Sequence, residues 1–201
     1  MEMNRYKALA LATCLSMATG TAAAEEGFYY GGALGFAKLE SQSAGIGRTE
    51  GQDATLGVVL GYRFSHDDQS WFGVEGTLDG TTGQRMTSVG VPLESCSDFS
   101  PDWCEVRGIA RVRGVYGAKV TNDIEVLSMV GVAAVAGLAE DGVGNYVDTT
   151  ATGLTIGVGG QRPMGGGMGR LEFVYDRFEG SNPGDFEKTL EVFSLRTVFM
   201  F

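Results

Sequence analysis

The fold is decided by one short stretch of the sequence, RLEFVYDRF at residues 170–178. Bulky apolar side chains alternate with charged ones along it, and a period of two residues is typical of a β-strand. One face of this predicted strand carries Leu171, Phe173 and Tyr175, and the other carries Arg170, Glu172 and Asp176. In a soluble sandwich the apolar face would form the core, whereas in a membrane barrel it would face lipid and the charges would line a narrow lumen. The charged face favours the barrel.

Eight segments of the sequence have strand patterns of this kind. They are residues 28–39, 55–64, 71–79, 106–118, 124–138, 151–162, 170–178 and 190–201. In the second segment Leu56, Val58, Leu60 and Tyr62 share one face, opposite Thr55, Gly57, Val59 and Gly61. In the last segment Phe193, Leu195, Thr197, Phe199 and Phe201 are expected to point outward, and Ser194 and Arg196 inward. The predicted fold is therefore an eight-stranded antiparallel up-and-down transmembrane β-barrel.

Two segments have weaker patterns. The outer face of 106–118 is barely lipophilic, and it is assigned by its charges: Arg107, Arg111 and Arg113 share one parity and cannot face hydrocarbon. For 124–138 the pattern does not decide which parity faces inward. The eight segments are separated by links of about 15, 6, 26, 5, 12, 7 and 11 residues. This alternation is typical of outer-membrane barrels, which have short periplasmic turns and longer outer loops.

The first 24 residues read as a cleaved signal peptide, so the barrel domain is predicted to be residues 25–201. Arg5 and Lys7 precede a short apolar run, and Ala22-Ala23-Ala24 offers a cleavage site. Cleavage leaves 24 acidic and 13 basic residues, a net charge of −11. This acidity gives no electrostatic reason to bind nucleic acid.

The predicted export of the chain also affects the expected state of its three cysteines. Cys14 lies inside the signal segment, where Thr13 is a poor residue to precede a lipidated cysteine. The two remaining cysteines, Cys96 and Cys104, are eight positions apart in a polar segment. An oxidising compartment favours a disulfide between them over two free thiols.

Four motifs carry a resemblance to a known family. They are FYYGGALGF at 28–36, LGYRF at 60–64, RLEFVY at 170–175 and the terminal VFMF at 198–201. The set resembles the small eight-stranded outer-membrane barrels of the OmpA and OmpX type, including the opacity-like surface proteins of Gram-negative bacteria. The resemblance implies an integral outer-membrane location, contact with lipid and lipopolysaccharide, and a C-terminal signal, here Phe199 and Phe201, read by the barrel-assembly machinery. It does not extend to cell-wall anchoring, because no peptidoglycan-binding domain follows.

A search for catalytic chemistry in the sequence predicts no enzyme and no cofactor. His66 is the single histidine, and it lies beside Asp67 and Asp68 in a predicted periplasmic turn. A Ser–His–acid site for lipid modification on the outer side therefore has no histidine. The glycine-rich stretches 157–160 and 165–167 lack the helix-opening pattern of a phosphate loop, and no metal site is predicted.

One charged set stands out from the rest of the sequence. Its members are Glu75, Asp79, Arg107, Arg111, Arg113, Glu172, Asp176 and Arg196. They could form a structural ion-pair lattice that fills the lumen, or line a gated ion path. Eight strands give an interior that side chains can just fill, which favours the lattice.

Function is then expected to reside in the outer loops. The longest, residues 80–105, carries the apolar residues Met86, Val89, Val91, Phe99 and Trp103. These could bind an extracellular ligand or pack as a cap on the barrel. Acidic loop residues such as Glu140 and Glu179 would repel lipopolysaccharide unless divalent cations bridge them. The predicted function is a non-enzymatic barrel with a role in envelope integrity or surface adhesion; the alternatives are a small porin-like channel and a soluble lipocalin-like barrel with its apolar faces inward.

Overall fold

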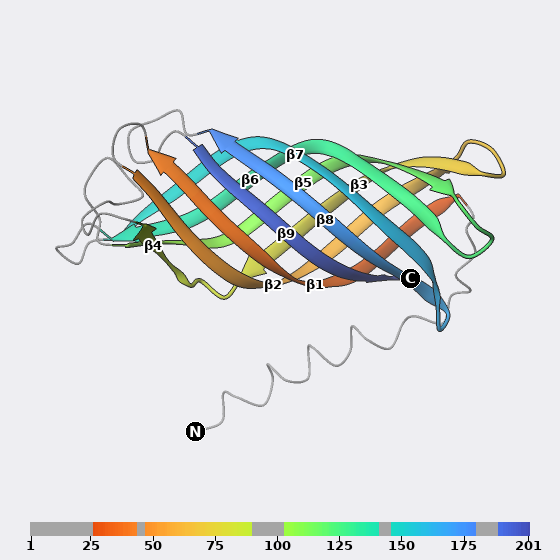
Figure 1. Cartoon of the computed structure of the whole chain (residues 1–201). Helices are drawn as coiled ribbons and strands as arrows, with labels where there is room; N and C mark the ends of the chain where they lie inside the picture. Colours follow the sequence, from red (N-terminus) through yellow and green to blue (C-terminus); the bar gives the residue numbers. More distant parts are fainter. Residues whose placement is uncertain (1–25, 44–46, 90–102, 141–145, 180–188) are drawn as a thin grey trace, which may run out of the picture.

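The computed structural model describes residues 26–43, 47–89, 103–140, 146–179 and 189–201, and these form one closed, antiparallel β-barrel (Figure 1). The strands are β1 Gly27–Ser43, β2 Gly47–Ser65, β3 Ser70–Thr81, β4 Arg85–Val89, β5 Trp103–Lys119, β6 Glu125–Glu140, β7 Tyr146–Met164, β8 Gly167–Glu179 and β9 Thr189–Met200. Each pairs with its neighbour, and β1 pairs with both β2 and β9, which closes the sheet. Among the described residues, no helix is long and apolar enough to cross a membrane.

The barrel has eight positions around its wall, because β3 and β4 occupy a single one. Both pair with β2 on one side and β5 on the other. Between them Gly83 adopts a positive φ of 68°, in the region that favours glycine. Buried Asp53 holds the break: its Oδ1 accepts hydrogen bonds from Thr82 Oγ1 at 2.6 Å and the Gln84 N–H at 3.0 Å. The eight predicted strands are confirmed, and β4, in the predicted loop 80–105, extends the wall position of the third.

The paired residues fix the tilt of the strands. Following the register from Ala37 through β9, β8, β7, β6, β5, β3 and β2 leads back to β1 at Gly27, ten residues away. With a rise of about 3.3 Å per residue and about 4.8 Å between strands, this offset gives a tilt of about 40°. The lumen of such a barrel is narrow enough for side chains to meet across it.

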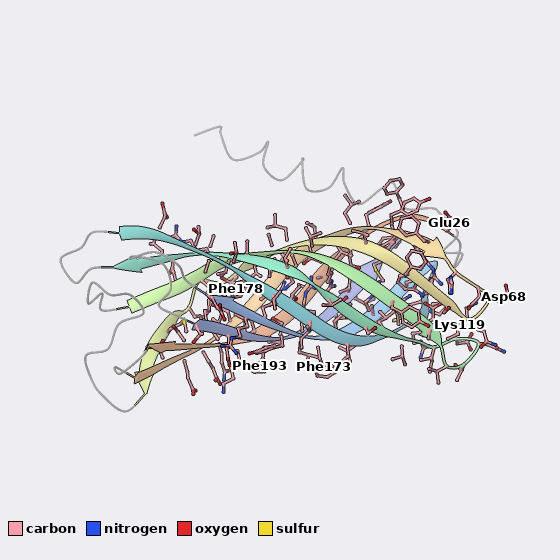
Figure 2. The ribbon with its side chains drawn as sticks, turned by 90° about the horizontal axis from the view of Figure 1, so that it is seen from above. Glu26, Asp68, Lys119, Phe173, Phe178 and Phe193 are labelled. Carbon is pink, nitrogen blue, oxygen red and sulfur yellow. The ribbon has the colours of Figure 1, made fainter. Side chains whose placement is uncertain are left out.

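The bulky apolar faces lie outside, where the sequence predicts them. Leu56 is 68% exposed, Phe173 56% and Phe199 46%, whereas the charged residues of the opposite parity are buried. In Figure 2, Phe173 and Phe193 extend from the outside of the wall. The lipocalin-like alternative, with the apolar faces inward, is therefore wrong. The undecided parity of 124–138 is also settled, because Leu127, Met129 and Val135 point inward and are buried.

Short turns occupy one end of the barrel. They join β2 to β3, β5 to β6 and β7 to β8, and Asp68 and Lys119 mark this end in Figure 2 beside Glu26 at the start of β1. Asp67 Oδ1 organises the first turn by accepting hydrogen bonds from the N–H groups of Gln69 at 2.8 Å and Ser70 at 2.6 Å. Gly165 and Gly166, both at positive φ, form the third turn. We call this the turn end and the opposite end the loop end.

Two of the predicted long links, after the first and fifth predicted strands, are much shorter than expected. β1 continues to Ser43 and β2 begins at Gly47, so most of the 15-residue link predicted after residue 39 is strand. A strand needs only about 9–11 residues to cross a bilayer. β1 and β2, with 17 and 19 residues, extend beyond that span. Their polar outer parts lack the alternation of apolar residues from which a strand could be predicted.

The predicted signal peptide, residues 1–24, lies outside the described residues.

Candidate functional site: the lumen

The centre of the lumen holds a compact set of paired charges, which we call the charge lattice. Its eight members project inward from β3, β5, β8 and β9, and each is at most 2% exposed: Glu75, Asp79, Arg111, Arg113, Arg170, Glu172, Asp176 and Arg196. Four carboxylates face four guanidinium groups, so the lattice is neutral as a whole. A buried charge without a partner is costly, and this balance removes that cost.

Glu172 is the most heavily shared carboxylate. Arg113 Nη2 lies 2.8 Å from both of its oxygens, Arg196 Nη1 donates to Oε2 at 2.9 Å, and Arg170 Nη1 donates to Oε1 at 3.0 Å. Arg113 and Arg170 also donate to Glu75, the latter at 2.6 Å. Charge-assisted bonds of this kind are stronger than neutral ones and fix the side-chain geometry.

The lattice continues toward the loop end through Asp79 and Asp176. Arg111 donates to Asp176 Oδ1 at 2.9 Å through Nε and to Oδ2 at 2.5 Å through Nη2, and it also donates to Asp79. Arg196 Nη2 reaches the other Asp79 oxygen at 2.9 Å. These bonds join β5 to β8 and β9 to β3, and each of those pairs is three positions apart around the barrel. The lattice therefore links strands across the lumen as well as around the wall.

Arg107 is not part of this lattice, contrary to the prediction. A β-bulge shifts the β5–β6 register between Val106 and Gly108. The extra residue reverses the parity of β5 at this point, so both Val106 and Ile109 point inward. Arg107 faces outward with its side chain 56% exposed, and its Nε donates to Glu105 at 2.7 Å. Strict alternation predicts that Arg107 faces inward with Arg111 and Arg113. Because the bulge lies between Arg107 and those two residues, Arg107 faces outward instead.

The predicted charged set lacks two residues that contribute to the lattice, Arg170 and Tyr29. The alternation of residues 170–178 predicts that Arg170 faces inward, and Arg170 is buried in the lumen. Tyr29 was not predicted; its hydroxyl donates to Glu75 Oε2 at 2.9 Å. Its ring fits over Gly61, where an added Cβ would lie 2.3 Å from the ring. In the first strand, Tyr29 alternates with Phe28 and Tyr30 and shares the small-residue face with Gly31 and Ala33. This alternation could have predicted that Tyr29 points into the lumen.

A second polar cluster lies in the lumen near the turn end. Glu125 accepts hydrogen bonds from Trp71 Nε1 at 2.8 Å, Gln161 Nε2 at 2.7 Å and Arg63 Nη2 at 3.3 Å. The Arg63 guanidinium lies 4.3 Å from the centre of the Trp71 ring, a cation–π distance. The indole packs over Gly117, where a Cβ would come within 2.3 Å of Nε1. Trp71 and Arg63 thus fill the lumen at this end.

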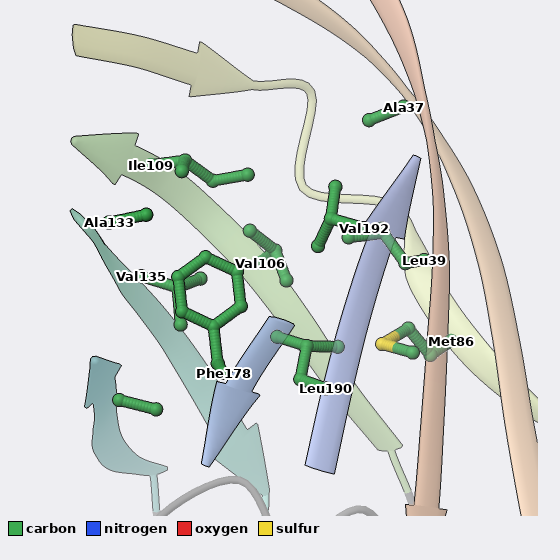
Figure 3. Close-up of a cluster of buried hydrophobic side chains, with 11 residues drawn as sticks. Ala37, Leu39, Met86, Val106, Ile109, Ala133, Val135, Phe178, Leu190 and Val192 are labelled. Carbon is green, nitrogen blue, oxygen red and sulfur yellow. The ribbon is translucent and has the colours of Figure 1, made fainter. Parts of the chain in front are cut away.

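Apolar side chains close the lumen near the loop end (Figure 3). We call them the cap: Ala37, Leu39, Met86, Val106, Ile109, Ala133, Val135, Ala151, Phe178, Leu190 and Val192. Phe178, Leu190 and Val192 have no exposed surface. Met86 comes from β4, within the long predicted loop, so this apolar loop residue packs on the barrel rather than facing outward. Val91 and Phe99 lie outside the described residues.

The remaining predicted site residues lie elsewhere. Cys96 and the side chain of Cys104 lie outside the described part of the chain, and their disulfide stays a prediction. His66 is exposed at the turn end, as predicted, with its ring 6.2 Å from that of Phe72. Phe201 lies on the outer wall, where its N–H donates to the Tyr30 carbonyl at 2.9 Å. The described residues contain no group of three or more His, Cys, Asp or Glu side chains that could hold a metal ion.

Two grooves lie on the outer wall of the barrel. One of about 790 Å³ crosses β2, β1, β9, β8 and β7 between rows that include Phe36 and Phe173, and another of about 310 Å³ lies near the turn end. The inward residues behind them are closed off, with Val174 3% and Arg170 2% exposed, while Phe36 is 72% exposed.

Comparison with known proteins agrees with this geometry. A family described as "Outer membrane protein beta-barrel domain" matches residues 8–178. Neisserial surface protein A has a similar structure, with a TM-score of 0.53 at 11% identity over 87% of this chain and 97% of its own. The attachment invasion locus protein Ail of Yersinia pestis (TM-score 0.46, 15% identity, 88% and 100%) and the N-terminal barrel of Pseudomonas aeruginosa OprF (0.41, 11%, 84% and 97%) are more distant in shape. No curated protein matches the sequence.

Proposed function

The chain belongs to the outer membrane protein beta-barrel domain family, and from that premise we propose that it is a closed, non-enzymatic barrel that holds contact loops on the outside of the cell. It is an integral protein of the outer membrane, with the turn end in the periplasm as in other barrels of this kind. The observation that carries the proposal is the filled lumen. The Trp71 cluster, the charge lattice and the cap occupy successive levels along the barrel axis.

A closed lumen argues against the channel alternative. A conducting pore needs a continuous water path, and polar groups that are free to exchange with ions. Here Glu172 and Arg113 are paired with each other, Arg113 also donates to Glu75 and Arg196 to Glu172, and Phe178 is buried in an apolar cap above them. A rigid scaffold with long loops at one end is suited to surface contact or envelope support instead.

Planar-bilayer recording of the purified, refolded barrel tests closure. We expect no discrete conductance steps from protein that shows the heat-dependent gel mobility of a folded barrel. A variant that removes three lattice side chains, Glu172→Ala with Arg113→Ala and Arg196→Ala, shows whether the Trp71 cluster and the cap keep the lumen closed without the lattice. Reproducible steps from the unaltered protein would overturn the closed barrel and favour the channel.

Loop function is tested separately in cells that lack the gene. Complementation with the full chain is compared with a variant in which residues 90–101 are replaced by a short Gly–Ser segment. We expect both to restore resistance to detergent, and only the full chain to restore attachment of the cells to a surface. Equal attachment by both variants would contradict a contact role for this loop.

The last strand supports the proposed route of assembly. Phe199 and Phe201 are about half exposed on the outer wall, where a partner could read them before lipid covers them. We propose that both contact the barrel-assembly machinery. Replacing Phe201 with Ala should lower the amount of folded barrel in the membrane, while the same purified variant still refolds in detergent.

A further inference from the structure

An aromatic girdle surrounds most of the turn end on the outer wall. Its members are Phe28, Tyr30, Tyr62, Phe64, Phe72, Tyr116, Phe199 and Phe201. Phe28 and Tyr62 are register partners with ring centres 4.8 Å apart, and Phe64 stacks on Phe72 at 5.4 Å. Aromatic side chains at this level mark the boundary between hydrocarbon and lipid head groups.

The girdle is interrupted over β6, β7 and β8. Tyr116 pairs with Ser128 on β6. Two residues nearer the turn end, Val126 on β6 pairs with Gly160 on β7, which pairs with Leu171 on β8. A Cβ added to Gly160 would have only the Glu125 carbonyl within 4 Å, at 3.8 Å. The missing side chain leaves the groove of about 310 Å³, whose outward lining is Ile124, Gly160, Arg162, Met164, Leu171, Thr197 and Phe199.

Arg162 lies at the rim of this groove and is exposed. Within the described residues it makes no ion pair or side-chain hydrogen bond. The other arginines whose side chains the structure describes are paired, including the outward Arg177, 3.7 Å from Glu179, and Arg107. An arginine facing the membrane boundary with no protein partner, directly beside an apolar groove, has the charge and shape to bind an anionic head group with an attached chain.

We propose that this gap in the girdle binds an anionic glycerophospholipid of the periplasmic leaflet. The Arg162 guanidinium donates to the phosphate, and one acyl chain lies over Gly160 between Ile124 and Leu171. The larger groove near the loop end is a weaker candidate, because Lys38 on its rim is paired with Glu40 at 2.5 Å. This site goes beyond the proposed surface role and does not depend on it.

Native mass spectrometry of the detergent-solubilised barrel, titrated with phosphatidylglycerol or phosphatidylcholine, tests the site. We expect Arg162→Gln to weaken phosphatidylglycerol binding about tenfold, the effect of losing one charge-assisted contact, with little change for phosphatidylcholine. Gly160→Leu fills the groove and should weaken both lipids. Heat-dependent gel mobility confirms that each variant is folded.

Two matched controls decide the outcome. Arg177→Gln removes an outward arginine at the loop end, and Ser128→Leu adds an outward leucine on the neighbouring strand; both should bind each lipid within twofold of the unaltered chain. The proposal is overturned if Arg162→Gln lowers phosphatidylglycerol affinity no more than Arg177→Gln does, or if Gly160→Leu has no more effect than Ser128→Leu.

Discussion

The charge lattice makes a sharp prediction for Glu172→Gln. The glutamine keeps the volume of the side chain but removes one of four buried negative charges, so that four guanidinium groups face three carboxylates. Glu172 has no exposed surface and accepts hydrogen bonds from Arg113, Arg170 and Arg196. Breaking a buried pair by removing one partner costs about 3–5 kcal/mol. Because three cations lose their shared anion here, we expect about 4 kcal/mol.

Urea unfolding in lipid vesicles, followed by fluorescence and by gel mobility, measures this loss. With a slope of about 2 kcal/mol per molar urea, the midpoint should fall by about 2 M. Glu179→Gln on the same strand is the control, since Glu179 is exposed and 3.7 Å from Arg177. An exposed pair contributes about 0–1 kcal/mol, so this variant should unfold close to the unaltered chain.

A double variant separates charge balance from packing. Glu172→Gln combined with Arg196→Gln restores neutrality and leaves Asp79 paired with Arg111. We expect it to be more stable than the sum of the two single changes implies, by a coupling of about 1–3 kcal/mol. If Glu172→Gln unfolds at the same urea concentration as Glu179→Gln, or if the two lattice changes simply add, the lattice does not stabilise the barrel through its charge balance.

Three further predictions follow from single features. Arg111→Gln should destabilise the barrel by about 3 kcal/mol or more, while Arg107→Gln should stay within about 0.5 kcal/mol in the same urea assay; equal effects would contradict the bulge. The hydrogen bonds from Gln69 and Ser70 hold the pKa of the Asp67 carboxyl below its usual 3.8. The turn it stabilises is therefore fully held above that pH and loosens as pH falls through the lower folded value, which NMR titration and amide exchange would detect. Cys96 and Cys104 should resist alkylation until a reductant is added, and labelling of the unreduced protein would exclude the disulfide.

Much of the wall was predictable because its physics is local. Each strand alternates between lipid and lumen, so a period of two residues reports both the strand and its outward face, as in Leu171 and Phe173. The two-residue alternation does not predict strands where neither face of the strand contacts lipid. Beyond the bilayer, β1 and β2 run through polar residues such as Glu50, and their extent depends on pairing with each other rather than on alternation.

The lumen was predictable in kind but not in detail. Parity identifies inward charges, yet it cannot anticipate an extra residue, and one bulge moves Arg107 to the outside. Tyr29 and Trp71 reach their partners because Gly61 and Gly117 provide room for their rings on adjacent strands. That fit depends on the stagger of ten residues around the barrel, which no single strand encodes.

The polar lumen also reconciles two demands on the same chain. A strand apolar on both faces would read as a continuous hydrophobic run, and such runs are retained in the membrane that an exported chain must first cross. Alternation avoids this, but it leaves polar side chains inside a barrel too narrow for bulk water. Pairing Glu75, Glu172 and their neighbours with an equal number of arginines makes those side chains tolerable. The charge lattice is thus the consequence of building a lipid-facing wall from strands that are only half apolar, and a filled lumen follows without any requirement for transport.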